Sequence, residues 1–284
     1  MTEIEHRVET TARTPRYSTT SFSEEELTAG RHREFIGGNW DTHGRAQLDF
    51  LVEHGLQPSH RFLDVGCGAL RAGRHLVDYL EPGHYYGIDA NLELIQAGYD
   101  RELTDAQRSR LPSANLRAND RFDGDFGVSY DVAIAQSVFT HVSLNHVRLC
   151  LYRVAQVMRP GGTFYVTFNE EPASRPVDTI IPGRTKPRMT ERNVFWYYRE
   201  DLRWASTIAP WQFRYIGDWS HPHGQMMVEL TRLEDGATAR QASAADRARA
   251  ALSGVRQTSP QGLPRRLRRT AGRGLRRVAR RLDR

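Results

Sequence analysis

The sequence predicts an α/β fold with a seven-stranded, mostly parallel sheet, a C-terminal antiparallel hairpin and helices on both faces. The first observation behind this expectation is that short apolar runs alternate with stretches of helical periodicity up to residue 168. The second is a glycine-rich turn directly after the first apolar run. The third is that the last two apolar runs, 213–219 and 226–233, flank a short polar segment, which indicates a hairpin.

The N-terminal residues 1–24 are rich in Thr, Ser and Glu and lack apolar periodicity, so we expect a flexible arm there. Residues 45–56 have apolar side chains at helical spacing, and Gln57-Pro58-Ser59 ends that helix. Strands and helices then alternate. The expected strands are 61–65, 84–88, 115–118, 130–135 and 163–168, and the expected helices among them are 70–80, 92–103 and 144–158. Arg159-Pro160-Gly161-Gly162 should end the last of these helices, because proline and glycine oppose helical continuation.

Residues 169–193 contain four prolines and no periodicity, and the segment is too long for an ordinary connection. Loops of this kind are often lids or substrate-binding segments. Residues 198–208 indicate a helix before the hairpin. After Asp235 the composition shifts to Ala, Arg, Ser and Gly, so we place the main domain at 25–235 and a tail at 236–284.

The positive charge of the chain is concentrated in the tail. Residues 240–284 hold 14 arginines and 2 acids, so residues 1–239 carry a formal charge of −6 although the whole chain carries +6. The basic pI therefore gives no reason to expect a nucleic-acid partner for the folded body. Within the tail, apolar residues at helical spacing are flanked by arginines, which suits peripheral contact with an anionic membrane. A disordered tail without a specific partner and nonspecific nucleic-acid attraction are the alternatives. The apolar positions are Leu263, Leu267, Ala271, Leu275, Val278 and Leu282.

Cysteine usage and hydropathy indicate the compartment. Cys67 and Cys150 belong to no Cys-x-x-Cys pair or Cys/His cluster, so we expect neither a disulfide framework nor a metal site. No stretch approaches the ~18 apolar residues of a membrane span, and the N-terminus lacks the apolar stretch of a signal peptide. A cytoplasmic protein is expected, with membrane contact only through the tail.

The first expected strand runs into Asp64-Val65-Gly66-Cys67-Gly68. Glycine permits unusual backbone angles and close approach, and the following helix N-terminus offers N–H groups to an anion. Asp89 ends the next strand 23 residues after Gly66, near the offset at which an acid meets a ribose diol. Inside one βαβ unit these features indicate nucleoside binding. The alternatives are an ordinary tight turn and a helix N-cap at Asp89.

The residues after the glycine turn distinguish a dinucleotide such as NAD from other nucleoside cofactors. A dinucleotide fingerprint has a third glycine where this chain has Arg71, and Gly73 comes two residues later, which disfavours NAD. Four ordered elements resemble the class I S-adenosylmethionine-dependent methyltransferases, whose fold is Rossmann-like, and the resemblance covers roughly residues 36–233. These elements are Asp64 to Gly68, Asp89, Tyr130 to Ile134, and Arg159 to Gly162.

The resemblance implies that S-adenosylmethionine is the cofactor. It implies that Gly66 and Gly68 face the methionine part, that Asp64 supports its amino group, that Asp89 binds the ribose hydroxyls and that Asp120 binds the adenine amino group. It also assigns cofactor contacts to Trp40, Arg71 and Gln136. A solvated loop around Asp120 and a packing role for Trp40 are the alternatives.

Methyl transfer from a sulfonium is an in-line displacement, so the protein mainly supplies orientation and a dry site, and no metal is required. A hydroxyl acceptor also needs a base, for which histidine is suited. His141 follows the fourth strand, His221 lies with His223 in the hairpin loop, and Glu170 ends the fifth strand, all near the sheet edge where ligands bind in such folds. Capping, an exposed loop position and a solvated acid are the respective structural alternatives.

The acceptor class follows from two missing motifs. The fourth strand is followed by Ala135-Gln136-Ser137-Val138, without the Asn/Asp-Pro-Pro-Tyr/Phe of nucleic-acid amino methylases, and there is no Pro-Cys nucleophile. We therefore expect O-methylation of a small-molecule or glycan hydroxyl. A NAD-dependent oxidoreductase and an inactive cofactor-binding scaffold are the alternatives.

Overall fold

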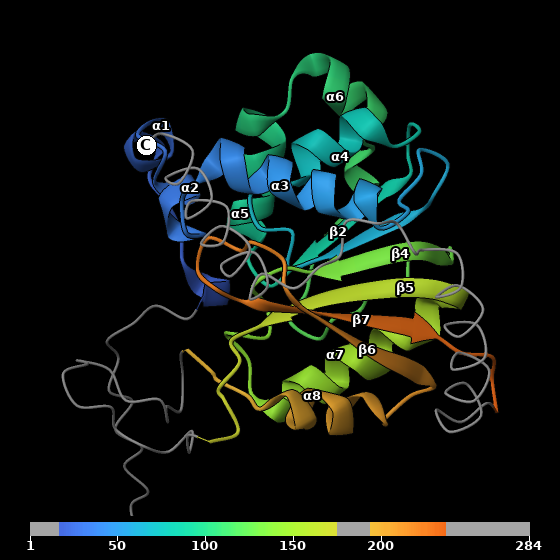
Figure 1. Cartoon of the computed structure of the whole chain (residues 1–284). Helices are drawn as coiled ribbons and strands as arrows, with labels where there is room; N and C mark the ends of the chain where they lie inside the picture. The colour runs from blue at the N-terminus through green and yellow to red at the C-terminus, as the bar shows by residue number, and fades with distance from the viewer. Residues whose placement is uncertain (1–16, 175–193, 237–284) are drawn as a thin grey trace, which may run out of the picture. The chain divides into compact units, whose positions relative to one another are not determined.

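A seven-stranded sheet organises residues 17–174 and 194–236, which are the residues that the computed structural model describes (Figure 1). The strand order is β3-β2-β1-β4-β5-β7-β6. Neighbours from β3 to β5 are parallel, whereas β7 is antiparallel to both β5 and β6, which confirms the predicted fold class. The strands are β1 (Phe62–Val65), β2 (Tyr85–Asp89), β3 (Leu116–Ala118), β4 (Tyr130–Ala135), β5 (Met158–Phe168), β6 (Trp211–Asp218) and β7 (Met226–Arg232).

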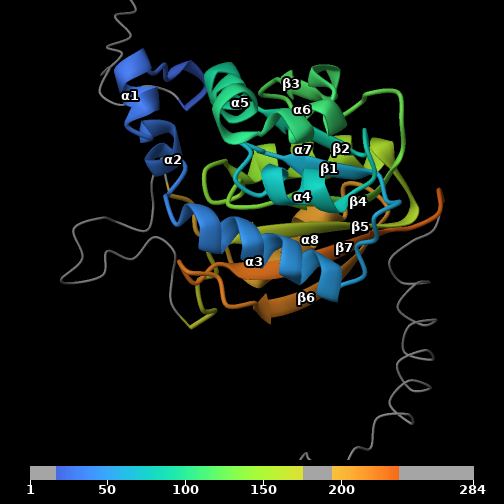
Figure 2. The same cartoon turned by 90° about the horizontal axis from the view of Figure 1, so that it is seen from above.

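Helices cover both faces of the sheet, as Figures 1 and 2 show. Because side chains alternate along a strand, the strands contribute side chains to a hydrophobic core on each face of the sheet. Leu63 and Val65 pack in the core that contains α7 and α8, whereas Phe62 packs with residues of α3 and α4. The helices are α1 (Glu24–Thr28), α2 (Arg31–Phe35), α3 (Trp40–Glu53), α4 (Gly73–Tyr79), α5 (Leu92–Ala97), α6 (Asp105–Arg110), α7 (Leu144–Val157) and α8 (Arg199–Ser206), with short helical turns η1 (Tyr17–Thr19), η2 (Gly98–Glu102) and η3 (Ser113–Asn115).

The starts of α3 and β5 differ from the sequence-based expectation. Helix α3 begins at Trp40 rather than near residue 45, after Asn39 adopts a left-handed conformation with φ of +47°. Strand β5 begins at Met158, so Arg159 to Gly162 form its first part rather than a turn that precedes it. Gly161 has a φ of +78° there, and the pairing with β4 shifts register between Tyr130 and Val132. The irregular start of β5 accommodates the proline and glycines.

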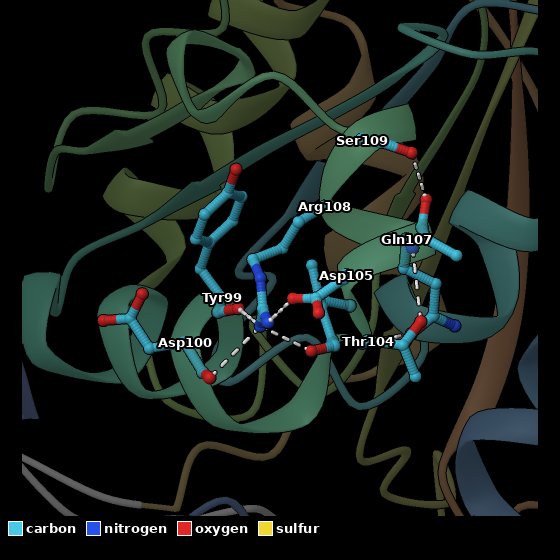
Figure 3. A network of polar contacts seen from close by, with 9 residues as sticks. Tyr99, Asp100, Thr104, Asp105, Gln107, Arg108 and Ser109 are labelled. Atoms are coloured by element: carbon cyan, nitrogen blue, oxygen red, sulfur yellow. Dashed lines mark hydrogen bonds and ion pairs between the residues drawn. The ribbon is translucent and has the colours of Figure 1, made fainter.

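The expected helix 92–103 is divided into α5 and the wider turn η2. The division coincides with a close approach, because a Cβ atom on Gly98 would lie 2.6 Å from the carbonyl carbon of Ala69. Only glycine allows this contact, which presses η2 against the loop after β1. Figure 3 shows how η2 ends: the Arg108 guanidinium donates hydrogen bonds to the carbonyls of Tyr99 and Asp100 at 3.3 and 3.2 Å. It also donates to the Leu103 carbonyl at 2.6 Å. These bonds satisfy helix-end carbonyls that have no partner within the helix.

The end of the predicted N-terminal arm is placed in the structure. Residues 17–19 form η1, and Ser23 caps α1 through a capping box with Glu26. Helix α2 is fixed to η2 by Glu102, whose buried carboxylate lies 2.6 Å from His32 Nε2 and accepts two hydrogen bonds from Arg33. Within residues 17–24, which were expected in the arm, Tyr17 and Glu24 contact Asp89 and Arg101. The rest of the arm (1–16), the loop 175–193 and the tail from residue 237, with its predicted membrane contact, lie outside the described residues.

Among residues 17–174 and 194–236, none of the helices has the length and hydrophobicity of a membrane span.

Candidate functional site

The glycine turn after β1 folds back onto the end of β2. The backbone N–H groups of Gly66 and Cys67 both donate to the Ile88 carbonyl, at 2.7 and 3.0 Å. Gly66 has a φ of +80°, and a Cβ atom there would lie 2.4 Å from Val138 Cγ2. The turn therefore requires glycine at position 66 for both its backbone angle and its packing.

Asp89 lies buried at the end of β2, and both oxygens of its carboxylate accept hydrogen bonds. Its Oδ2 accepts from the Gly68 N–H at 2.9 Å and from the Tyr17 hydroxyl at 3.2 Å, and its Oδ1 accepts from the Asn91 N–H at 2.8 Å. Burial raises the pKa of Asp89 to about 6, although these hydrogen bonds oppose the rise. Tyr17 was not predicted, because a single aromatic residue in a polar, aperiodic segment gives no pattern.

Asp64 lies inside the fold behind the glycine turn. Its Oδ2 accepts a hydrogen bond from the Tyr85 hydroxyl at 2.8 Å, and the side chain is only 4% exposed. Burial raises the pKa of Asp64 to about 7, because few donors replace the water that its carboxylate loses. Two carboxyl groups on neighbouring strands thus have pKa values raised towards neutrality.

Arg71 stands where a dinucleotide fingerprint has its third glycine. It holds the end of residues 17–38, which we call the N-terminal segment. Its Nη1 donates to the carbonyls of Ile36 and Gly38, both at 3.1 Å. The Nε of Arg71 is buried and has no hydrogen-bond partner among the described residues. Burial lowers the pKa of Arg71 to about 10, so the side chain is a buried cation at neutral pH.

Two predicted cofactor residues have different surroundings. Trp40 packs with Ala69 and Leu94, and the guanidinium groups of Arg33 and Arg74 lie 5.1 and 5.7 Å from its ring centre. These contacts match the packing role that was the alternative for Trp40. Asp120 is exposed two residues beyond Ala118, which pairs with Asp89 across β3 and β2. It is thus at the same sheet edge as Asp89.

A second group of polar side chains gathers beyond the end of β4. Gln136 Nε2 lies 2.7 Å from His221 Nε2 and 3.3 Å from His43 Nε2, and the two imidazole rings meet edge to face with centres 4.7 Å apart. All three side chains are buried. We call this group the histidine cluster. The hairpin brings His221 to the β4 end as the topology predicted, whereas His43 was missed, because on α3 it shows only as one polar residue in a helical pattern.

His43 comes to the cluster through a close helix contact. A Cβ atom on its neighbour Gly44 would lie 2.4 Å from the carbonyl oxygen of Arg71, so glycine lets α3 approach the loop after β1. A second network secures the other side. Gln225 Oε1 accepts hydrogen bonds from the hydroxyls of Ser137 and Thr167, at 3.1 and 2.7 Å, which joins the hairpin loop to the ends of β4 and β5.

Burial keeps both histidines of the cluster neutral. It lowers the pKa of His43 to about 3 and that of His221 to about 4, and the positive charge of Arg71 contributes in both cases. His221 Nδ1 accepts from the backbone N–H groups of His223 and Gln225 at 3.1 and 3.4 Å, so its ring proton is on Nε2. His221 Nε2 then needs an acceptor, which the Gln136 amide supplies when its oxygen faces His221. The other atom of the amide points away from His221 and is buried without a hydrogen-bond partner in the described structure.

The other two predicted catalytic residues lie in different settings. His141 is exposed in the turn between β4 and α7, where its backbone N–H donates to the Val138 carbonyl at 2.9 Å. Glu170 accepts from the Tyr215 hydroxyl and pairs with Arg199 at 3.0 Å. The Glu170 carboxylate is thus engaged at the β6 side of the sheet. No group of three or more metal-binding side chains occurs among residues 17–174 and 194–236.

Comparison with known proteins gives matches in the same region. Residues 63–164 match a family model described as a methyltransferase domain. The sugar N-methyltransferase KedS8 from Streptoalloteichus sp superposes with a TM-score of 0.54 at 16% identity, over 76% of this chain and 94% of that one. A S-adenosylmethionine-dependent methyltransferase from Clostridium acetobutylicum gives 0.53 at 11% identity, over 74% and 99%. S-adenosylmethionine-bound CalS10, an amino pentose methyltransferase from Micromonospora echinaspora, gives 0.52 at 18% identity, over 75% and 98%. At these identities the structures are similar in fold.

The raised pKa of Asp64 predicts a pH-dependent stability. A carboxyl group whose pKa is higher in the folded state stabilises the fold most below its unfolded value of 3.8, and this contribution is lost as the pH rises through about 7. In Asp64→Asn, which keeps an acceptor for Tyr85, the loss should disappear. Urea unfolding from pH 4 to 8 should therefore show that the variant gains stability over the native chain as the pH rises. A constant difference between the two proteins would contradict the assignment.

Proposed function

The chain carries a methyltransferase domain of the class I, S-adenosylmethionine-dependent family, and on that basis we propose that it methylates a hydroxyl group of a small molecule or glycan beyond the end of β4. The cofactor is S-adenosylmethionine. When bound, it supplies a methyl group attached to a positively charged sulfur.

The residues at the ends of β1 and β2 fit the cofactor. In the proposal, Asp89 binds the ribose hydroxyls through the carboxylate that now accepts from Tyr17 and Gly68. Arg71 offers a buried cation whose Nε lacks a partner in the described structure, and the carboxylate of the methionine part would supply one. Gly66 and Gly68, which have no side chain, would let the backbone approach the methionine part closely.

The histidine cluster is the observation that favours a hydroxyl acceptor. Neutral imidazoles and an amide can donate to and accept from a hydroxyl, which is both donor and acceptor. His43 Nδ1 and the outward atom of the Gln136 amide are buried without partners in the described residues, so a bound acceptor would complete their hydrogen bonding. The positive charge of Arg71 near both histidines favours a neutral acceptor over a cationic one.

The similar structures support the acceptor class only coarsely. Two of them are a sugar N-methyltransferase and an amino pentose methyltransferase, which favours a small or sugar-like acceptor. Transfer to oxygen rather than nitrogen rests on the histidine cluster alone. The match to a methyltransferase domain decides against the NAD-dependent alternative.

The methylated product distinguishes transfer to oxygen, transfer to nitrogen and an inactive scaffold. The chain should be incubated with host-cell extract and a methyl donor labelled with carbon-13 in the methyl group, and the labelled product examined by NMR and mass spectrometry. We expect a methoxy group on a small molecule or glycan. An N-methyl product would contradict the oxygen assignment. Cofactor binding without any labelled product would favour the inactive scaffold.

Asp89→Ala should weaken S-adenosylmethionine binding by about 1–3 kcal/mol, because the ribose hydroxyls lose their charged acceptor. Isothermal titration calorimetry measures this directly. Asp100→Ala removes an exposed carboxylate from η2 and serves as the matched control, with unchanged affinity. Equal affinity of the native chain and Asp89→Ala would remove Asp89 from the cofactor site.

His141 is the proposed base, because it lies in the exposed turn after β4, at the sheet edge where ligands bind in such folds. His141→Ala should lower turnover by roughly 10²- to 10⁴-fold at unchanged cofactor affinity. The control is His146→Ala, which removes another exposed imidazole from α7. Normal turnover with a lower melting temperature would instead indicate that His141 only stabilises the turn.

A further inference from the structure

The N-terminal segment lies across the residues assigned to the cofactor. Asn91, which is fully buried, donates from its Nδ2 to the carbonyls of Tyr17 and Thr20 at 2.6 and 2.9 Å. The Tyr17 ring stacks on Phe35 of α2 with ring centres 5.6 Å apart. In Figures 1 and 2, α1 and α2 lie beside α5, the helix that follows β2. The segment is therefore held at the end of β2.

The hydroxyl of Tyr17 points to the atoms that a ribose would use. It donates to Asp89 Oδ2, the oxygen that also accepts from Gly68. A ribose diol binds such an acid by donating its hydroxyl hydrogens to the same carboxylate. The Tyr17 hydroxyl and the ribose hydroxyls are thus chemically equivalent donors for one acceptor. A Cβ atom on Gly68 would lie 3.9 Å from the Tyr17 hydroxyl and 3.5 Å from Ile36, so the same segment covers the outer side of the glycine turn.

The segment is held at both ends, in each case by a residue assigned to the cofactor: Asp89 at one end and Arg71 at the other. Asp89 and Asn91 hold Tyr17, and Arg71 holds the carbonyls of Ile36 and Gly38. Desolvation of its hydroxyl and the neighbouring charge of Asp89 raise the pKa of Tyr17, although the residue as a whole is 42% exposed, so the hydroxyl remains a neutral donor. A ribose that donated to Asp89 Oδ2 would compete there with the Tyr17 hydroxyl.

We propose that Tyr17 is an internal competitor for the ribose site, so that S-adenosylmethionine binds by exchanging the Tyr17–Asp89 hydrogen bond for bonds from its ribose. The proposal rests on the proposed role of Asp89. A site that is open only part of the time has an apparent affinity reduced by the open fraction. Tyr17 then determines both the affinity and the rate of cofactor entry.

Tyr17→Phe tests the exchange, because it removes the hydroxyl and keeps the ring that stacks on Phe35. We expect S-adenosylmethionine and S-adenosylhomocysteine to bind about 3- to 10-fold more tightly, mainly through faster association. Calorimetry and stopped-flow measurements give the two quantities. The matched control is Tyr79→Phe, whose lost hydroxyl donates to the Leu56 carbonyl away from the site, and which should bind like the native chain.

The binding results distinguish a failure of the competitor role of Tyr17 from a failure of the proposed function. Equal or weaker cofactor binding by Tyr17→Phe, with normal binding by the native chain, overturns the competitor role alone. If none of the three proteins binds either compound, the proposed function fails and the inference fails with it.

Hydrogen exchange of the native chain gives an independent readout. If the ribose displaces Tyr17, saturating S-adenosylhomocysteine should speed amide exchange in residues 17–20, whose carbonyl contacts with Asn91 then loosen. Slower exchange in those residues would show that the segment closes on the cofactor instead, and would overturn the proposal.

Asn91→Ser supplies a second variant that keeps an N-cap side chain for Leu94 N–H but removes the donors to Tyr17 and Thr20. It should also speed cofactor association. Combined with Tyr17→Phe, its effect should be less than additive, because both changes release the same segment. Slower association in Asn91→Ser would count against the proposal.

Discussion

The arrangement of this domain depends on the burial of two carboxyl groups, Asp64 and Asp89, where neighbouring parallel strands end. Removing a carboxylate from water is costly unless hydrogen bonds replace the lost solvent. Asp89 obtains them from the backbone of the glycine turn, from the start of α5 and from Tyr17. Asp64 obtains a hydroxyl from Tyr85. The glycine turn, the first turn of α5 and the N-terminal segment are thereby brought to one place.

The order of elements could be predicted from the sequence because it depends on periodicity. The strands of the sheet and the helices between them follow from alternating apolar patterns, and the hairpin follows from two apolar runs close in sequence. The boundaries that differed depend on tertiary contact. Helix α3 starts early because its first turn packs against other elements, and α5 yields to η2 where Gly98 meets the Ala69 backbone. Neither contact leaves a local signature.

The candidate site also contains residues that could be predicted from the sequence and residues that could not. The glycine turn, Asp89 and the position of His221 follow from topology, since the carboxyl ends of parallel strands share one edge. His43 and Tyr17 come from elements whose placement the sequence does not state, and each is a single residue in an ordinary local context. The neutrality of His43 and His221 also could not be predicted, because the lowered pKa values result from burial. The roles of His141 and Glu170 stay predictions.

The position of β7 has a consequence for the order in which the chain can fold. Although β7 is the last described strand, it lies between β5 and β6, and β6 pairs with β7. During synthesis β6 therefore has no partner in the sheet, and β5 has an open edge, until residues near 232 have left the ribosome. His221 and Gln225 belong to the connection that this last pairing fixes. The acceptor side of the site is thus completed only by a late, long-range event, whereas the βαβ unit with the glycine turn is built from contacts close in sequence.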